Sequence, residues 1–253
     1  MEKPFFSIVI PTLNEERCIK TILSDLEKQV FSDFEVIHVD GGSSDGTVAV
    51  SESFGDRLAH RVIKHRVRHV SSQRNRGAKE AVGEWVLFMD ADNRLPRGYL
   101  AELKREMSRP QNRGVDLFTT LIHLTAADKK MNPLYVPAVR IINIALYFSR
   151  TGSKPNIFGA LVGMRRSVAA DLKFSRRVKI LEDRLLLEEA VERGYKYMVF
   201  KRPTYAYSMR RFNKNGFVKT TMQGLWVNAL FLLGYEFEKR DFRYDMDGGP
   251  THE

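Results

Sequence analysis

Residues 85–92 read Trp-Val-Leu-Phe-Met-Asp-Ala-Asp, an apolar run that ends directly at two carboxylates. A short continuous apolar run is typical of a strand that is buried on both faces, as in a parallel sheet. Residues 5–10 (Phe-Phe-Ser-Ile-Val-Ile) and 34–39 (Phe-Glu-Val-Ile-His-Val) are runs of the same kind, and polar residues follow each of them. Helical patterns separate the runs, which indicates β-α-β units. We therefore predict an α/β fold with a mostly parallel central sheet flanked by helices.

The other elements follow from the same patterns. Asn14 is predicted to cap a helix whose apolar positions fall on one face. These positions are Ile19, Ile22, Leu23, Leu26 and Val30. Further helices are predicted over residues 47–53, 71–82, 97–107 and 183–193, and further strands over 60–65, 115–121, 157–164 and 195–200, the last ending at Pro203. Residues 124–156 show no clear period and are left unassigned. One domain with a change of topology near residue 120 fits this order best.

The charge balance points to an anionic partner without naming it. The chain has 253 residues, and its 41 Lys and Arg against 31 Asp and Glu leave a net charge of +10. Nucleic acid, an acidic membrane surface and a phosphorylated small molecule all suit such a surplus. The single cysteine, Cys18, excludes a disulfide scaffold and a cysteine-rich zinc site. Because no signal-peptide core follows the first residues, we expect a cytoplasmic protein.

Polar residues follow three of the predicted strands, where an open α/β sheet binds its ligands, and a fourth polar group opens the last predicted helix. They are Pro11–Glu15, Asp40–Ser43, Asp90–Asp92 and the Glu182–Asp183 pair. Two carboxylates at the mouth of a buried strand repel each other unless a cation joins them. Oxygen ligands favour Mg²⁺ or Mn²⁺ held together with substrate phosphates. The alternative for Asp92 is a helix cap, and a second Asp-x-Asp at 245–247 is interpreted as part of a solvated tail.

Five motifs, in order over residues 7–183, resemble glycosyltransferase family 2, which has the GT-A fold. They are Ser7–Glu16 (SIVIPTLNEE), Val39–Thr47 (VDGGSSDGT), Arg74–Gly77 (RNRG), Phe88–Asp92 (FMDAD) and Leu181–Asp183 (LED). Arg210-Arg211-Phe212 is similar to a segment of some members. By contrast, the glycine-rich motifs of P-loop and ordinary dinucleotide-binding proteins are absent. The chain is thus identified as a member of the family, with a nucleotide-sugar donor, a divalent metal and transfer with inversion as the implied properties.

The resemblance also implies roles for individual residues. Asp183 would be the general base, and Glu182 would orient or cap rather than react. The alternative for Asp183 is a helix N-cap. Donor contacts would come from Pro11, Thr12, Asn14, Glu15, Asp40, Arg74, Asp90, Ala91 and Asp92, with Asp92 and Asp90 holding Mn²⁺ or Mg²⁺. Arg74 would pair with the diphosphate or the base, or else be a solvated helix charge, and Arg210 and Arg211 would lie on the acceptor side.

One position departs from the family pattern and leaves the donor base open. The usual second Asp of the V-D-D-G-S motif is Gly41 here. A UDP-sugar is our first expectation and a GDP-sugar the second. A polyprenyl- or dolichyl-phosphate sugar synthase is the alternative enzyme. A non-enzymatic nucleic-acid-binding protein is the remote one, and the basic stretch 57–76 counts against it because it lacks Phe, Tyr and Trp.

The C-terminal third combines basic and apolar stretches. Six basic residues and one acidic residue occupy 165–179, whereas the 14 residues 222–235 carry no charge and are too few to span a bilayer. Together with Ile141–Phe148, they suit core packing, an oligomer interface or an amphipathic contact with an anionic membrane and a lipid-linked acceptor. A polysaccharide acceptor is equally open. We predict a catalytic domain over 1–213 (donor half 1–120, acceptor half 121–213) and an apolar helix with a polar tail over 214–253.

Overall fold

The computed structural model describes residues 3–150, 155–157, 159–178, 180–233, 235 and 237. Lys179 and the predicted tail with Asp245 and Asp247 lie outside these residues. The strands are β1 (Phe6–Thr12), β2 (Phe34–Asp40), β3 (His60–Lys64), β4 (Trp85–Met89), β5 (Leu117–His123), β6 (Leu161–Arg165) and β7 (Tyr197–Ala206). The helices are α1 (Glu16–Glu27), α2 (Thr47–Glu52), α3 (Val70–Glu80), α4 (Tyr99–Met107), α5 (Ala126–Met131), α6 (Tyr135–Ser149), α7 (Arg166–Asp171), α8 (Glu182–Glu192), α9 (Arg210–Asn215) and α10 (Phe217–Leu232).

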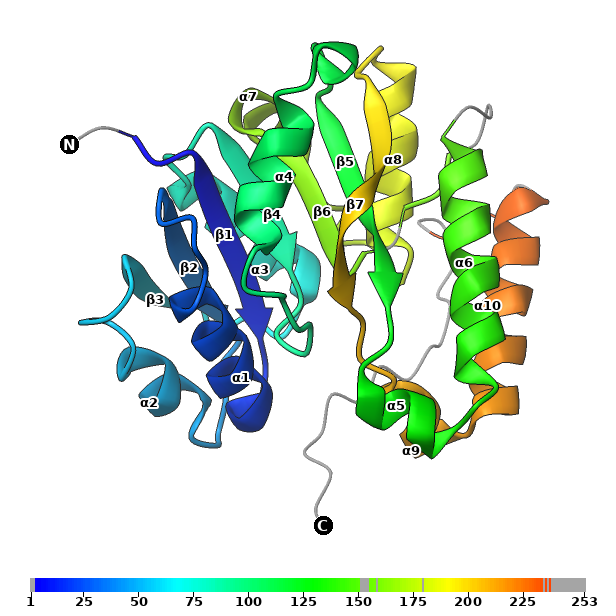
Figure 1. Cartoon of the computed structure of the whole chain (residues 1–253), viewed down its shortest axis with the longest axis horizontal. Coiled ribbons are helices and arrows are strands. Elements are labelled where there is room, and N and C mark those ends of the chain that lie inside the picture. The colour runs from blue at the N-terminus through cyan, green and yellow to red at the C-terminus, as the bar shows by residue number, and fades with distance from the viewer. Residues whose placement is uncertain are drawn as a thin grey trace.

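The strands form one seven-stranded sheet in the order β3-β2-β1-β4-β6-β5-β7 (Figure 1). The four strands β1 to β4 run parallel to one another, whereas β6 is antiparallel to both of its neighbours, β4 and β5. The predicted α/β class and the change of topology near residue 120 are therefore confirmed. The parallel half brings the carboxyl ends of β1, β2 and β4 to one edge of the sheet, which positions the site described below.

Helices cover both faces of the sheet because the strands are apolar on both sides. On one face, Ile8 and Ile10 of β1 belong to a buried cluster that also contains residues of α1, α4 and α6. On the other face, Val9 of β1 lies against Gly77 of α3, in a second cluster that also contains Val86 of β4 and residues of α7 and α8. Every residue of β1, β2 and β4 is buried, as the continuous apolar runs predicted. No described helix is both long and apolar enough to cross a membrane.

Three local predictions are wrong. Asn14 does not cap α1, because it adopts a left-handed conformation (φ 55°) and the helix begins only at Glu16. The four other predicted apolar positions of α1 are buried, but Val30 lies beyond its end and is 58% exposed. Strand β7 does not end at Pro203. It continues to Ala206 past a shift of register against β5, and a cis peptide bond joins Arg202 to Pro203.

The unassigned segment 124–156 contains two helices, α5 and α6. The side chain of Thr125 accepts a hydrogen bond from the backbone of Asp128, and the Asp128 side chain bonds back to the Thr125 backbone. This capping box starts α5. Helix α6 then packs against β5 and β7, and the Asn143 side chain bonds to both backbone groups of Ile122. A tertiary contact of this kind, rather than periodicity, holds α6 in place.

Candidate active site

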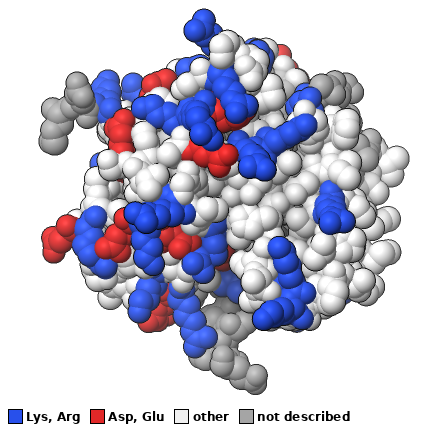
Figure 2. All heavy atoms as spheres, viewed as in Figure 1, with Lys and Arg blue, Asp and Glu red and all other residues white. Residues whose placement is uncertain are grey.

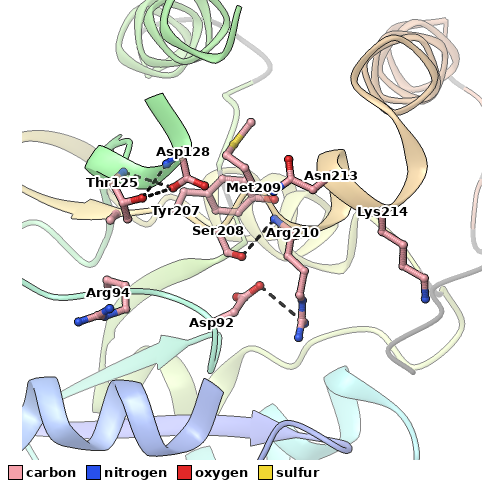
Figure 3. Close-up of a pocket in the computed structure, with 11 residues that line it drawn as sticks. Asp92, Arg94, Thr125, Asp128, Tyr207, Ser208, Met209, Arg210, Asn213 and Lys214 are labelled. Atoms are coloured by element: carbon pink, nitrogen blue, oxygen red, sulfur yellow. Dashed lines mark hydrogen bonds and ion pairs between the residues drawn. The ribbon is translucent and has the colours of Figure 1, made fainter. Parts of the chain in front are cut away.

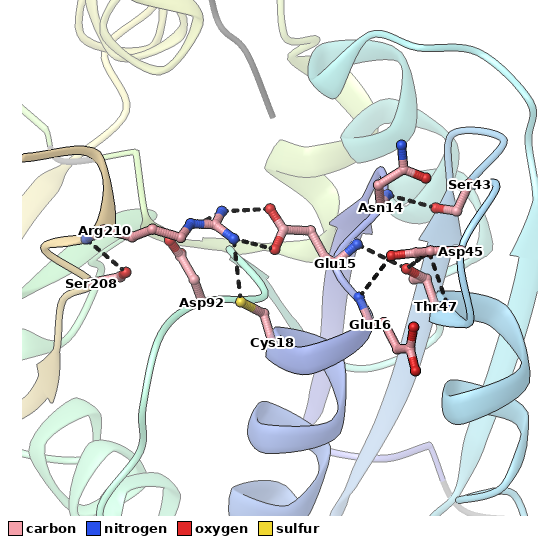
Figure 4. Close-up of polar contacts among 10 residues, drawn as sticks. All are labelled: Asn14, Glu15, Glu16, Cys18, Ser43, Asp45, Thr47, Asp92, Ser208 and Arg210. Atoms are coloured by element: carbon pink, nitrogen blue, oxygen red, sulfur yellow. Dashed lines mark hydrogen bonds and ion pairs between the residues drawn. The ribbon is translucent and has the colours of Figure 1, made fainter. Parts of the chain in front are cut away.

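The loops after β1 and β2 are joined by hydrogen bonds at the carboxyl edge of the sheet (Figure 4). The backbone N–H of Asn14 donates to the Ser43 hydroxyl, and the Asn14 side-chain oxygen accepts from the Ser44 N–H. The Glu15 N–H donates to the Thr47 hydroxyl at 2.8 Å. These bonds explain the left-handed backbone of Asn14, whose short polar side chain tolerates that conformation. The two loops thus form one ordered wall around the ends of β1 and β2.

Asp40 organises the second of these loops. One of its carboxylate oxygens accepts from the backbone N–H groups of Gly42 and Ser43, and the other accepts from the Ser43 hydroxyl at 2.5 Å. Burial acts to raise the pKa of Asp40, but these hydrogen bonds from Ser43 and Gly42 outweigh it and lower the pKa below its usual value. The carboxylate is therefore charged and nearly enclosed, with 3% of the residue exposed. Its predicted contact with a nucleotide base stays a prediction.

Gly41, the position that departs from the family motif, is a close-packing site. A Cβ atom there would lie 2.2 Å from Nε2 of Gln73 and 3.2 Å from the backbone oxygen of Thr12. Gln73 itself is 3% exposed and donates to the Val67 backbone oxygen. The space for a larger residue at position 41 is therefore filled by Gln73 of α3. Gln73 was not predicted as a site residue, because no sequence motif identifies a glutamine whose side chain fills space beside another segment.

Asp90 and Asp92 differ in their surroundings. The backbone N–H of Asp90 donates to the Ala160 oxygen, and its side chain accepts from the Arg74 guanidinium at 2.9 Å. Asp92 instead lines a cavity (Figure 3), and burial together with the nearby charge of Asp90 raises its pKa to about 6. The helix-cap interpretation of Asp92 is wrong, because α4 has Gly98 at its N-cap. Asp92 is thus the carboxylate of the pair that lines the cavity, whereas the Asp90 side chain is the more exposed of the two, at 36% against 23%.

Arg74 is buried and joins two motifs that lie far apart in the sequence. Its guanidinium donates to Glu182 at 2.8 Å, to Asp90 at 2.9 Å and to the Gly159 backbone oxygen at 3.0 Å. Only 2% of Arg74 is exposed, so the alternative of a solvated helix charge is wrong. The predicted pairing of Arg74 with a diphosphate or base stays a prediction. What the structure shows is an arginine that holds the Asp90 and Glu182 carboxylates in fixed relation.

Asp183 is the second residue of α8 and not its N-cap, so that alternative is also wrong. The N-cap is Leu181, which makes no side-chain cap and has a left-handed backbone (φ 62°). A leucine in this region costs conformational energy, and such strain often occurs at functional sites. Gly159 lies against the carboxylate, since a Cβ there would be 2.5 Å from Oδ2. Burial and then repulsion from Glu182 raise the pKa of Asp183 to about 7, against the opposing effect of Arg74.

Arg210 spans the two halves of the chain. Its guanidinium forms two hydrogen bonds with the Glu15 carboxylate, at 2.7 and 2.5 Å, and lies 3.8 Å from Oδ2 of Asp92 (Figure 4). Hydrogen bonding to Glu15 is the largest cause of its raised pKa. Its neighbour Arg211 is exposed and does not line the cavity. Of the two predicted acceptor-side arginines, only Arg210 lies beside Asp92 among the described contacts.

The cavity beside Asp92 has a volume of about 470 Å³ and is formed largely by segments that the sequence left unassigned. Its lining residues are Asp92, Arg94, Thr125, Asp128, Ala206, Tyr207, Ser208, Met209, Arg210, Asn213 and Lys214 (Figure 3). Asp92 and Arg210 were predicted from their motifs, and for the remaining lining residues the local signal is the Thr125-x-x-Asp128 capping pattern. The others come together because the end of β7 and helix α9 return to the ends of β1 and β4.

The model of glycosyl transferase family 2 matches residues 7–173. This chain belongs to that family. Among similar family relatives is the amylovoran biosynthesis glycosyltransferase AmsB of Erwinia amylovora, 28% identical over 262 residues that cover 96% of this chain and 85% of AmsB. A PGL/p-HBAD biosynthesis glycosyltransferase of Mycobacterium bovis is 41% identical over 97 residues. That match covers 38% of this chain and 38% of the mycobacterial protein.

Solved structures of glycosyltransferases share the fold of this chain. The mannosyltransferase PcManGT of Pyrobaculum calidifontis, solved with GDP-Man and Mn²⁺, has a TM-score of 0.65 and 21% identity, covering 83% of this chain and 58% of that one. S. aureus TarS 1–349, solved with UDP, has a TM-score of 0.64 and 22% identity, covering 84% and 63%. At this level of identity the likeness shows the fold alone. The predicted family and GT-A fold are confirmed.

Proposed function

We propose that this protein transfers a sugar from a nucleotide-diphosphate donor to an acceptor hydroxyl with inversion at the anomeric carbon. The observation that carries the proposal is the contact of Arg74 with both Asp90 and Glu182. It ties the carboxylates after β4 to the start of α8, where Asp183 follows Glu182. A charge-stabilising group and a proton acceptor are the two parts that such a transfer needs.

The carboxylates after β4 suit Mn²⁺ or Mg²⁺. Among the described residues, no three His, Cys, Asp or Glu side chains gather in a metal-binding group. A site of one or two carboxylates completed by diphosphate oxygens is the usual arrangement for such ions. Asp92 would hold the metal, with Asp90 kept nearby by Arg74. When bound, the metal neutralises charge that develops on the leaving nucleoside diphosphate.

Asp183 is proposed as the general base. Its raised pKa, near neutrality, suits a carboxylate that must accept a proton under working conditions. Asp183 takes the proton of the acceptor hydroxyl while the acceptor oxygen bonds to the anomeric carbon. The bond from that carbon to the diphosphate oxygen breaks on the opposite side, and the diphosphate leaves with the electron pair. Glu182, paired with Arg74 at 2.8 Å, positions the start of α8 rather than reacting.

The donor is proposed to be a UDP-sugar, with a GDP-sugar second. Thr12, Asn14, Glu15 and Asp40, with Pro11 at the end of β1, would surround the nucleoside. Neighbours of similar fold have been solved with UDP and with GDP-Man plus Mn²⁺, which supports a nucleotide-sugar without choosing the base. The tight fit of Gly41 against Gln73 makes Gln73 a candidate for reading the base.

A sugar synthase that acts on a polyprenyl phosphate is the second candidate. Arg94, Arg210 and Lys214 line the cavity beside Asp92. Because Arg94 pairs with Asp25 and Arg210 with Glu15, Lys214 is the cation of this lining that we propose to meet a phosphate acceptor. A phosphate oxygen needs no strong base, so the two candidates differ in their dependence on Asp183. An Asp183→Asn variant that keeps most of its activity would favour this second candidate.

A thermal-shift screen tests the donor and the metal together, because a ligand that binds only the folded protein raises its melting temperature. The protein is screened against UDP- and GDP-sugars with and without Mn²⁺. We expect one donor to stabilise the wild type in a Mn²⁺-dependent way and Asp92→Ala to lose that dependence. Asp56→Ala, at an exposed aspartate of the α2–β3 loop, is the matched control. Equal Mn²⁺-dependent shifts for wild type and Asp92→Ala would contradict the metal assignment.

A further inference from the structure

Helices α6 and α10 leave apolar side chains in solvent. Figure 1 shows both helices at the same end of the sheet, and their N-terminal ends touch through the Tyr135 and Phe217 rings, whose centroids are 5.5 Å apart. We call the following side chains the α6–α10 face. They are Ile141 (67% exposed), Ile144 (59%) and Phe148 (66%) of α6, and Val218 (72%), Met222 (60%), Leu225 (59%) and Trp226 (62%) of α10.

The spacing of these residues shows that each helix has two different sides. On α10, the exposed residues fall at i, i+4, i+7 and i+8, which is one stripe of a helix. The opposite side carries Val227 and Phe231, which are buried in a cluster with Ile180 and with Leu185 of α8. On α6, Val139 and Leu146 are buried in the same way, while Ile141, Ile144 and Phe148 face outward. The exposed stripes are therefore additional to what the core requires.

The surroundings of the α6–α10 face are basic. Residues 126–150 and 210–232, which contain α5, α6, α9 and α10, hold eight Lys and Arg and a single acidic residue. The basic residues are Lys129, Lys130, Arg140, Arg150, Arg210, Arg211, Lys214 and Lys219, and the acidic one is Asp128. In Figure 2 the side of the molecule that α6 and α10 form shows Lys and Arg on an uncharged background, without Asp or Glu. Most of the surplus positive charge of the chain thus belongs to these two segments.

We infer that the α6–α10 face docks on an anionic lipid bilayer. Apolar and aromatic side chains on a helix stripe, with cations beside them, match the requirements of an interfacial contact. Trp226 and Phe148 are of the kind that settles at the boundary between headgroups and acyl chains. A second copy of the chain fits this surface less well, because a two-fold contact would bring two basic surfaces together. Anionic headgroups would instead neutralise them.

The α6–α10 face is connected along the chain to the cavity beside Asp92. Helix α5 leads directly into α6, and α9 leads into α10. Asp128 of α5 and Asn213 and Lys214 of α9 line the cavity beside Asp92. The same pair of connections therefore joins the docking face to the cavity wall. A protein held on the bilayer through α6 and α10 would hold the cavity close to the headgroups, where a lipid-linked acceptor presents its polar end.

Vesicle flotation tests the inference without any need for activity. Full-length protein is mixed at low salt with vesicles of phosphatidylcholine alone or with 30% phosphatidylglycerol. We expect flotation only with the anionic vesicles and its loss at high salt, because the Debye length falls to about 3 Å at 1 M. The catalytic variant Asp92→Ala should float like the wild type, so a failure of the proposed function would not be mistaken for a failure of docking.

Variants distinguish binding through the α6–α10 face from non-specific adsorption of the protein to vesicles. The double variant Ile144→Glu/Trp226→Glu should weaken vesicle binding by about tenfold or more, since one buried large apolar side chain alone contributes about that factor. Val30→Glu, at an apolar residue that is 58% exposed elsewhere on the molecule, should leave binding unchanged. Lys130→Gln/Lys219→Gln should weaken it by several-fold. Lys20→Gln/Lys28→Gln, at a residue of α1 and at the C-cap of that helix, should not.

Two kinds of result would overturn the inference. One is a flotation result: either no flotation with anionic vesicles at low salt, or flotation that the Ile144→Glu/Trp226→Glu variant does not reduce. The other is a stable dimer in sedimentation-equilibrium measurements on the wild type that this variant converts to a monomer, since the face would then be covered by a second copy. Circular dichroism of the variant confirms that the fold is intact in either case.

Discussion

The edge of the sheet around Asp40 and Arg74 and the pair of helices α6 and α10 are built in opposite ways. At the sheet edge, polar side chains are buried and almost every one has a specific partner, as with Arg74 between Asp90 and Glu182. On α6 and α10, apolar side chains such as Trp226 are exposed, and they lie beside cations. A buried polar network demands one geometry because each unpaired group is costly. An exposed apolar stripe requires no particular geometry of its neighbours until another surface covers it.

This contrast predicts where substitutions are felt most. Replacing Arg74 with Met is expected to lower the free energy of unfolding by about 3–5 kcal/mol, because it leaves the buried carboxylate of Glu182 and the partly exposed one of Asp90 without their partner. Arg76→Met on the same helix is the control. Its side chain is 40% exposed and pairs with Glu80, and an exposed pair contributes about 1 kcal/mol or less. Urea denaturation followed by circular dichroism measures both, and equal losses for the two variants would remove the contrast.

Asp183→Asn is expected to affect stability and activity in opposite directions at the buried sheet edge. Loss of a general base is expected to lower kcat by about 10²- to 10⁴-fold. Because the folded state raises the pKa of Asp183, ionisation of this group costs stability, and that cost grows as pH rises from the ordinary carboxyl range through about 7. The variant, which has no charge to bury, should therefore melt at a higher temperature than the wild type at pH 8 and lose this advantage below about pH 4. A lower melting temperature of the variant at pH 8 would contradict the argument that burial and repulsion from Glu182 disfavour the charged form of Asp183.

The activity of the wild type is expected to fall as the pH is lowered, and this effect is smaller than those of the substitutions above. The base acts only when deprotonated, so kcat/KM should fall about tenfold for each pH unit below the pKa of Asp183, which lies near 7. Initial rates between pH 5 and 9 at saturating Mn²⁺ measure this limb. If Asp183 has an ordinary carboxyl pKa in the free enzyme, the fall will instead occur below about pH 4.

The smallest effect is expected on the α6–α10 face in the absence of lipid. Leu225→Ala should change the free energy of unfolding by less than about 0.5 kcal/mol, as for most exposed positions. Leu87→Ala in β4 should lower it by about 2–5 kcal/mol, because Leu87 is fully buried. The same substitution is thus measured in both regions. A large loss at Leu225 would show that this side chain belongs to the core, and the distinction between the two regions would fail.

The first half of the fold was predictable because its signals are local. Strand β4 occupies the predicted residues 85–89, and α1 buries four of the five predicted apolar positions. Helix α6 was not predicted because it is apolar around most of its circumference, so its sequence shows little helical periodicity in hydrophobicity. Strand β7 was cut short at Pro203 because a proline ordinarily ends a strand, whereas here the shift of register against β5 accommodates it.

The sequence by itself determined the family, the strands of the parallel half and the polar residues at their ends, since each of these depends on neighbours along the chain. Only the tertiary structure decided what those polar residues contact. Arg74 meets Glu182 across 108 positions of the sequence, and Arg210 meets Glu15 across 195. No local period encodes such a meeting, because it arises when β6, β7 and the helices after them return to the parallel half. The same return leaves α6 and α10 with an apolar side in solvent, so tertiary packing also decided which apolar residues became core and which became surface.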